Sequence, residues 1–248
     1  GICISENLKS KLVGEDLSIN LETSFFEGSM TFGEIVLDGR DQKEVNLTSY
    51  MCHPSMGNNE LSGPLVLLLL YQLLQRHDRK FTYRFSIFPE TIGAITYIKK
   101  NYERLKKRTV YGLVLTCLGG PIKNISYKMG KNTKIKNIFQ EYLISRGDVI
   151  IRPFDPTEGS NERHFCFPTV DLPFGQFGRT LYTKYPEYHN SADDIAFTDI
   201  NQIMNSARDI YQLLIDFEDQ YVESETTVKP SINVHSTDSE DFFIPKAK

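Results

Sequence analysis

The sequence lacks the features that would place a protein in a membrane, on nucleic acid or in an oxidising compartment. Its longest apolar run, residues 64–70, is too short to span a bilayer, and no positively charged start leads into an apolar secretory segment. A formal net charge of -4 provides no basic footprint for nucleic acid. The four cysteines include no CxxC pair, which is typical of reduced thiols. We therefore expect a cytoplasmic protein with neither nucleic-acid nor membrane partners.

What the chain does contain is an alternation of strand-like and helix-like segments. Its 248 residues, 40% of them hydrophobic, are enough to build a real core. The patterns predict helices at residues 62–76, 92–108, 132–146 and 198–221, the first of them capped by Ser62. They predict strands at residues 17–23, 30–37, 45–50, 81–88, 110–118, 125–129, 149–152 and 170–175, with a hairpin turn at residues 38–41.

This alternation predicts an α/β fold, a three-layer α/β/α sandwich around a mainly parallel or mixed central sheet. The domain is expected to cover residues 1–222, with a strand-rich part at residues 1–44. The polar composition of residues 223–248 indicates a tail or linker.

Polar groups able to bind a metal or move a proton follow several of the apolar segments. They occur at residues 53–60, at Glu90, at residues 159–164 and at residues 185–194. In open α/β sheets, ligands bind outside the carboxyl ends of the strands, so these groups are expected to meet. A histidine followed closely by amides and a carboxylate, as at His53, is typical of zinc hydrolases.

Four blocks of sequence carry a family resemblance that covers nearly the whole chain up to the polar tail. They are CHPSMGNNELSG at residues 52–63, FPETIG at 88–93, GSNER at 159–163 and YPEYHNS at 185–191. The chain resembles the bacterial aminopeptidase-like proteins often found among surface-polysaccharide and glycan genes. That group is similar to the co-catalytic zinc aminopeptidases, so the resemblance implies their fold and a site for one or two Zn²⁺ ions.

The resemblance also implies roles for single residues. His53 matches the first ligand histidine of the family and His189 matches the last. Glu90 stands where the family has a pair of glutamates, one a general base and the other a ligand. Asp193 matches the aspartate that follows the last ligand, and it could cap a turn or orient the imidazole of His189.

Two asparagines stand where the family has aspartates. Asn59 is at the position of the bridging aspartate and Asn161 is at the aspartate of the Ser-Asp block; each precedes a glutamate, Glu60 or Glu162. A neutral amide is a poor bridge between two cations. Three interpretations remain: two metals held with Glu60 and Glu162, one zinc on His53, His189 and Glu90, or a site that has lost its metal.

The implied chemistry is hydrolysis of a peptide or amide bond by metal-activated water. Glu90 would accept the water proton, or Glu60 if Glu90 is a ligand. Arg163, Tyr188 and Arg179 are candidates to bind a substrate carboxylate or to stabilise the oxyanion.

Three functions compete on this evidence. The first is a zinc-dependent hydrolase of aminopeptidase type, acting on a peptide or an amide-linked small molecule. The second is a catalytically impaired scaffold that binds a glycan or peptide, and the third is an amidase or deacetylase of amino-sugar biosynthesis. The sequence allows a homo-oligomer but does not predict one.

Overall fold

The computed structural model describes residues 3–121, 125–128, 143–147, 149–180 and 183–227, the last six without side chains. By its contacts the chain divides into two units, Gly1–Met30 and Thr31–Lys248. The first contains helix α1, Glu6–Leu12, whose N-cap Ser5 accepts a hydrogen bond from the Leu8 N–H. Residues 17–23 form no strand, contrary to the prediction. Their apolar alternation is exposed because they pair with no other strand in the described part of the chain.

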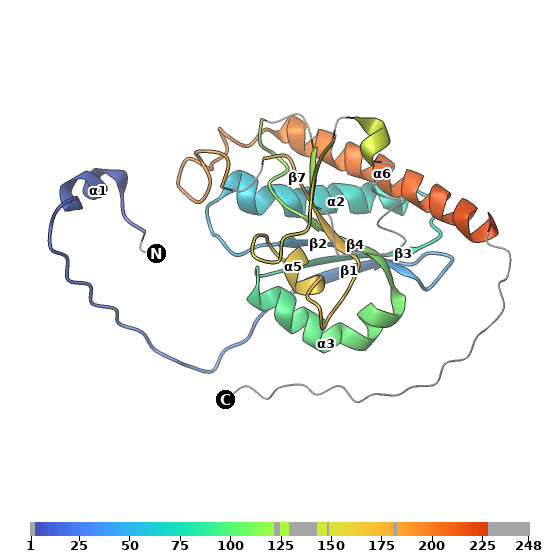
Figure 1. The fold of residues 1–248 in the computed structure, drawn as a ribbon, viewed down its shortest axis with the longest axis horizontal. Coiled ribbons are helices and arrows are strands. Elements are labelled where there is room, and N and C mark those ends of the chain that lie inside the picture. Colours follow the sequence, from blue (N-terminus) through green and yellow to red (C-terminus); the bar gives the residue numbers. More distant parts are fainter. Residues whose placement is uncertain (1–2, 122–124, 129–142, 148, 181–182, 228–248) are drawn as a thin grey trace. The chain divides into compact units, whose positions relative to one another are not determined.

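The second unit is built on a mixed sheet whose seven described strands lie in the order β1-β3-β2-β4-β7-β5-β6 (Figure 1). The strands are β1 Gly33–Leu37, β2 Glu44–Tyr50, β3 Thr82–Phe88, β4 Thr109–Leu115, β5 Ile125–Lys128, β6 Val149–Arg152 and β7 Phe174–Gly178. The central strands β3, β2, β4 and β7 are mutually parallel, whereas β1 and β5 pair antiparallel with their neighbours β3 and β7. The carboxyl ends of the four central strands therefore lie at one edge.

The predicted hairpin at residues 38–41 is wrong, because β1 pairs with β3 and not with β2. All seven residues of β2 are buried, whereas four of the five in β1 are exposed. A strand with exposed side chains suits the edge of a sheet, and a fully buried strand must take a central place. The burial difference agrees with the place of β1 at the edge of the sheet and of β2 inside it.

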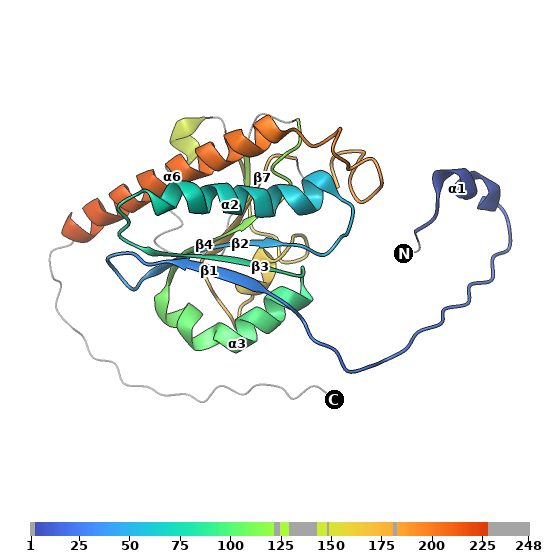
Figure 2. The same ribbon diagram turned by 180° about the vertical axis from the view of Figure 1, so that it is seen from behind.

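Helices cover both faces of the sheet (Figure 2). Helices α2, Ser62–Gln75, and α6, Ile200–Thr227, pack on one face, and α3, Ile92–Arg108, and α5, Glu162–Phe165, lie on the other. The first layer encloses a leucine-rich core that includes Leu67, Leu70 and Leu74 of α2. The second encloses an aromatic cluster in which Phe165 stacks on Phe174 at 3.9 Å. The predicted three-layer α/β/α fold is confirmed.

Several boundaries differ from the predictions. Ser62 does not cap α2: a π-helical turn, η1, Gly57–Leu61, precedes it, and the Ser62 hydroxyl donates to the Asn58 carbonyl. The last strand begins at Phe174 instead of residue 170, and α6 continues to Thr227, past the predicted end of the domain. Most of the predicted helix at 132–146, and residues 228–248 of the predicted tail, lie outside the described residues.

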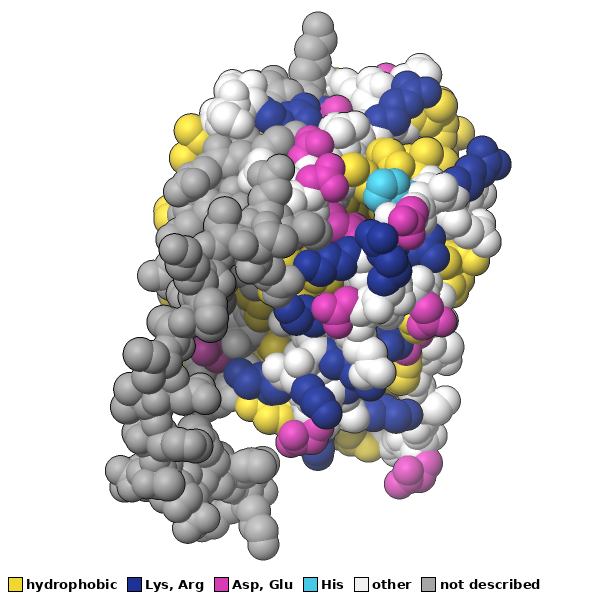
Figure 3. All heavy atoms as spheres, turned by 90° about the vertical axis from the view of Figure 1, so that its right-hand side faces the viewer, with side chains coloured by type: hydrophobic (Ala, Val, Ile, Leu, Met, Phe, Trp, Pro, Cys, Tyr) yellow, Lys and Arg dark blue, Asp and Glu magenta, His cyan; other side chains and the backbone are white. Residues whose placement is uncertain are grey.

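Lysine and arginine side chains are interspersed with aspartate and glutamate on the face seen in Figure 3. This mixture agrees with a net charge of only -4. Among the helices of the described residues, none combines the length and apolar character needed to cross a membrane.

Candidate metal centre

The imidazoles of His53 and His189, far apart in the sequence, lie together in the fold. Their ring centroids are 4.8 Å apart. His53 follows the carboxyl end of β2, and His189 lies in the segment between β7 and α6. His189 has a φ of 57°, in the left-handed region, and its ring stacks on Tyr188 at 3.9 Å. Two imidazoles this close together at a sheet edge are candidate ligands for one zinc ion.

A buried carboxylate orients the first of these imidazoles. Glu60 Oε1 lies 2.7 Å from His53 Nδ1, and Oε2 accepts the Cys52 backbone N–H at 2.6 Å. Because an ionised carboxylate only accepts, Nδ1 must donate, which leaves Nε2 of His53 as the open lone pair. The Glu60 side chain is 1% exposed. Glu60 thus contacts the back of the imidazole, which is the place of an orienting group and not of a bridging ligand.

Cys52 completes a group with His53 and Glu60 in which the three ligand atoms lie within 4.8 Å of one another. Burial, together with the nearby carboxylates of Glu60 and Glu90, raises the pKa of the Cys52 thiol to about 11. The Cys52 Sγ lies 3.8 Å from His53 Nδ1 and 3.7 Å from Glu60 Oε1, on the side of the imidazole that faces away from Nε2. Cys52 is for this reason a weaker candidate ligand than either imidazole.

Asp193 connects the segment that contains His189 to the turn η1 before α2 through hydrogen bonds. Its carboxylate accepts the backbone N–H groups of Asn58 at 2.6 Å and Asn59 at 2.9 Å, and its carbonyl accepts that of Gly57 at 2.8 Å. An anion is stabilised at this helical N-terminus. Gly57 is required by close packing, since a Cβ there would lie 2.7 Å from the Asp194 carbonyl oxygen. Asp193 therefore acts on the backbone of η1, as the capping alternative predicts.

Glu90 lies at a strained turn after β3. Thr91 has φ 60° and ψ -75°, and the Ile92 N–H donates to the Glu90 carbonyl at 2.7 Å. These values describe a γ-turn of the positive-φ form, a rare and strained conformation for a β-branched residue. The Ser160 hydroxyl donates to Glu90 Oε1, and Asn161 Oδ1 accepts the Thr91 N–H at 2.9 Å. The segment containing Ser160 and Asn161 therefore holds the turn that carries Glu90.

The segment that contains Ser160 and Asn161 is itself held in place by a buried ion pair. Lys128 Nζ lies 3.1 Å from Glu162 Oε1 and also donates to the carbonyls of Asp155 and Glu158. Burial raises the pKa of Glu162, and Lys128 opposes that shift. Gly159 has a φ of 137°, and a Cβ there would collide with the Glu162 carboxylate. The Glu162 carboxylate is thus engaged by Lys128 and is not a free metal ligand.

The two asparagines at the aspartate positions are both buried, and each has one side-chain atom without a hydrogen-bond partner in the described part of the chain. For Asn59 this atom is Oδ1, and for Asn161 it is Nδ2. The other amide atom of each residue is bonded, by Cys117 Sγ at 3.6 Å and by the Thr91 N–H. Neither asparagine supplies an anion.

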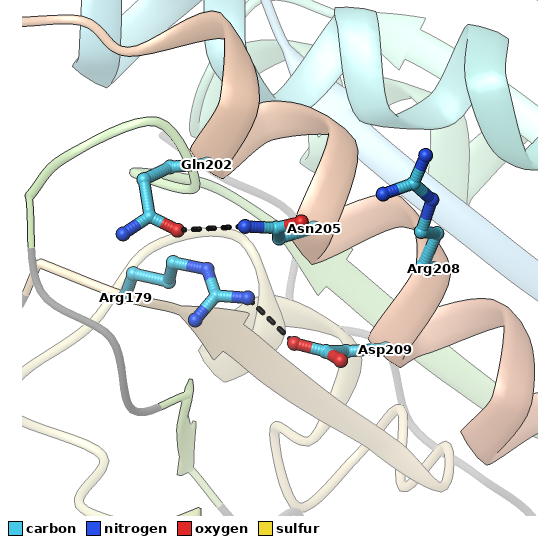
Figure 4. Close-up of a pocket in the computed structure, with 5 residues that line it drawn as sticks. All are labelled: Arg179, Gln202, Asn205, Arg208 and Asp209. Carbon is cyan, nitrogen blue, oxygen red and sulfur yellow. Dashed lines mark hydrogen bonds and ion pairs between the residues drawn. The ribbon is translucent and has the colours of Figure 1, made fainter.

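The three candidate substrate residues are dispersed. Tyr188 stacks on His189 and so lies at the centre. Arg163 is half-buried, and its Nε is a buried atom without a partner in the described residues. Arg179 is turned toward α6, where its guanidinium pairs with Asp209 at 2.6 Å (Figure 4). It lines a separate cavity of about 360 Å³, together with Gln202, Asn205, Arg208 and Asp209.

Electrostatics favour neutral imidazole at the second histidine. Burial lowers the pKa of His189, and the neighbouring His53 lowers it further, whereas Glu90 and Glu60 act in the opposite direction. A metal ligand must be neutral imidazole, so the site holds His189 in its ligating form. The residues present therefore offer one zinc ion two imidazole ligands, of the three protein ligands that a catalytic zinc ion takes. They do not fit a second ion, because Asn59 and Asn161 are neutral and Glu162 is paired with Lys128.

Sequence reasoning missed Ser160 and Lys128 as contributors to this site. Ser160 was visible beside Asn161, but its partner Glu90 is 70 residues away. Lys128 lies within a short strand, where a lysine ordinarily faces solvent. No local signal pointed to its pairing with Glu162, 34 residues later.

The fold and the edge-of-sheet site together define an α/β protein of the aminopeptidase-like class. Residues 17–220 match the domain family of unknown function DUF4910, and the chain belongs to this family. The named relatives confirm the resemblance to the aminopeptidase-like group.

Named relatives agree with that class. A Clostridium acetobutylicum protein named as a polysaccharide biosynthesis protein with an aminopeptidase-like domain is 33% identical over 220 residues, which are 88% of this chain and 50% of that protein. A crystal structure from the same organism that carries the name peptidase has a TM-score of 0.70 at 33% identity and covers 75% of this chain and 44% of that one. The chain thus spans about half the length of these relatives.

A zinc aminopeptidase from Bacillus subtilis shares the fold with a TM-score of 0.61. The match covers 74% of this chain and 49% of that one. At 15% identity, this likeness extends to the fold alone.

Proposed function

We infer that the chain is a zinc-dependent hydrolase of aminopeptidase type that cleaves a peptide or amide bond. The observation that carries this inference is the 4.8 Å approach of the His53 and His189 rings, with Glu60 buried behind His53. His53 and His189 would hold a single ion. When bound, zinc supplies a Lewis acid that activates water and polarises a carbonyl at neutral pH.

Two glutamates would then assist the reaction: Glu60 would orient the imidazole of His53, and Glu90 would accept the proton of the attacking water. Glu60 keeps the proton of His53 on Nδ1 and presents Nε2 to the centre. Ser160 occupies Oε1 of Glu90, which leaves Oε2 to accept a proton. We assign Glu90 as the proton acceptor, and the zinc content of Glu90→Gln tests this role against that of a third ligand.

The polysaccharide-related name of the Clostridium protein adds a substrate class to this proposal. We extend the proposal to an amino sugar or an amino-acid derivative carrying an amide. An amidase or deacetylase of amino-sugar biosynthesis would use the same groups. The catalytically impaired scaffold is the second candidate, and the two neutral asparagines favour it.

Zinc content and hydrolysis test the inference together. The purified protein is expected to hold about one zinc per chain, and His53→Ala and His189→Ala are each expected to lose most of it while staying folded by circular dichroism. His77→Ala, in the loop between α2 and β3, is the control that keeps the metal.

Glu90→Gln is expected to keep the zinc and lower hydrolysis of aminoacyl anilides or of acetylated amino sugars by about 10²- to 10⁴-fold. Loss of zinc in this variant would make Glu90 a ligand. Full zinc content in both histidine variants would defeat the inference, and a protein without zinc or activity would be the binding scaffold.

A further inference from the structure

Asn161 has a fixed orientation that leaves its amide donor open. The Thr91 backbone N–H can only donate, so the side-chain atom 2.9 Å from it must be Oδ1. Nδ2 then points elsewhere and has no partner in the described part of the chain, although the residue is fully buried. Buried polar atoms are rarely left unpaired. Nδ2 of Asn161 therefore requires an acceptor atom from outside the described residues.

Asn59 presents the complementary atom. It is 2% exposed, its backbone N–H is held by Asp193, and Nδ2 contacts Cys117 Sγ at 3.6 Å. Oδ1 is the buried atom without a partner in the residues that the structure describes. Asn59 adjoins Glu60, which contacts His53, and Asn161 contacts the turn that carries Glu90. One open acceptor thus belongs to the residue before Glu60, and one open donor belongs to the residue that holds the turn of Glu90.

The chemistry of the pair does not match a bridging site between two cations. An amide N–H₂ cannot bind a metal, and an amide oxygen carries no charge with which to bridge two ions. The carboxylates that could compensate are engaged, Glu162 by Lys128 and Glu60 by His53. A neutral group with both an N–H and an oxygen would satisfy both asparagines.

We propose that Asn59 and Asn161 form a neutral subsite for an amide group of the substrate, with Asn59 Oδ1 accepting its N–H and Asn161 Nδ2 donating to its oxygen. This proposal rests on the proposed function, because it places the amide beside His53 and Glu90. The ligand class is an N-acylated amine, carried by an amino sugar or by an amino acid. A free ammonium group would leave Asn161 Nδ2 without an acceptor.

Calorimetric titration of the purified full chain with two pairs of probes tests the proposal. N-acetylglucosamine is compared with glucosamine, and N-acetylalanine with alanine, at neutral pH. Because a site built to hydrogen-bond a group rejects the analogue lacking it, the acetylated member of at least one pair should bind about tenfold more tightly or better. The pair that shows the preference identifies the carrier as sugar or amino acid.

Two near-isosteric variants locate the effect. Asn161→Asp retains an oxygen for the Thr91 N–H but replaces the donor by an acceptor, so the acetyl preference should be lost. Asn59→Asp adds a negative charge, so binding of glucosamine or alanine should tighten. The matched control is Asn201→Asp, an exposed position near the start of α6, which makes the same charge change and should alter neither affinity.

The outcomes separate this proposal from the proposed function. Equal affinity for acetylated and free amines in both pairs, or an acetyl preference that survives in Asn161→Asp, overturns the subsite whatever the zinc content. The zinc content of the same samples tests the proposed function. A metal-free protein whose preference for acetylated ligands depends on Asn161 would support the subsite and contradict the zinc hydrolase. A zinc content that rises from one to two in the Asn59→Asp/Asn161→Asp double variant would support the neutral subsite as the reason for a single ion.

Discussion

The residues that hold His53 and Glu90 in place lie at very different distances from them along the sequence. His53 is oriented by Glu60, seven residues later, from within the same stretch of the chain. Glu90 is held by Ser160, 70 residues later, and Ser160 lies in a segment that Lys128 fixes from β5. One half of the centre is therefore a local structure and the other depends on the tertiary fold.

The difference has consequences for stability. A change behind His53 removes a short-range contact and leaves the packing of the sheet intact. A change at Lys128 or Gly159 disturbs a segment that connects β5, α5 and the turn before α3. We therefore expect variants on the Glu90 side to unfold the protein more easily, and variants on the His53 side to weaken the metal site.

The largest effect is expected from Lys128→Met. It leaves the Glu162 carboxylate buried without its cation, and breaking a buried ion pair in this way costs about 3–5 kcal/mol. Urea denaturation monitored by circular dichroism measures the loss. The double variant Lys128→Met/Glu162→Gln should recover part of it, because no charge is then stranded. A loss under about 1 kcal/mol would mean that the pair does not hold the segment.

The Lys128→Met defect should also depend on pH. Burial raises the pKa of Glu162 above its usual value, and Lys128 opposes this shift. Without the lysine the carboxyl has a still higher pKa in the folded state, so protonation favours folding. Protonation of Glu162 stabilises the folded Lys128→Met variant fully below the pKa of a glutamate in the unfolded chain, about 4.3. This stabilisation is lost as the pH rises through the pKa of Glu162 in the folded state. Unfolding should therefore show a larger defect at pH 7 than at about pH 5.

A smaller loss is expected from Gly159→Ala, which tests the same segment without changing a charge. The position has φ 137°, and an added Cβ would meet the Glu162 carboxylate and would lie 2.6 Å from Lys128 Nζ. Backbone strain at such a position costs about 1–3 kcal/mol, to which the collision adds. Gly33→Ala is the control, since a Cβ at that position would have open space within 4 Å and its φ is ordinary. Equal unfolding midpoints for the two variants would contradict the role of Gly159.

The same division explains how much could be predicted from the sequence. The sandwich, most strand and helix positions, and the approach of residues 53, 90 and 189 to one sheet edge follow from periodicity and from the rule for ligand sites in parallel sheets. The neighbour of β1 could not be predicted, because a turn at residues 38–41 suits a hairpin as well as a crossover to β3.

The roles of the glutamates show a similar limit. Glu60 and Glu162 each follow an asparagine and look equivalent in the sequence. In the structure one contacts His53 Nδ1 and the other a buried lysine. A side chain's partner across the fold cannot be inferred from its neighbours in the chain, and the choice between ligand, orienting group and ion pair depends on that partner.

The smallest effect on stability, and a specific one on the metal, is expected from Glu60→Gln. The amide keeps the shape of the side chain and can still accept from His53 Nδ1, but it removes the negative charge that strengthens the imidazole as a ligand. Zinc affinity, measured by competition with a chromogenic chelator, should fall about 10- to 100-fold, with little change in the unfolding midpoint. Glu103→Gln, exposed on α3, is the matched control. Unchanged zinc affinity together with lost hydrolysis would instead assign Glu60 as the proton acceptor and reverse its role relative to Glu90.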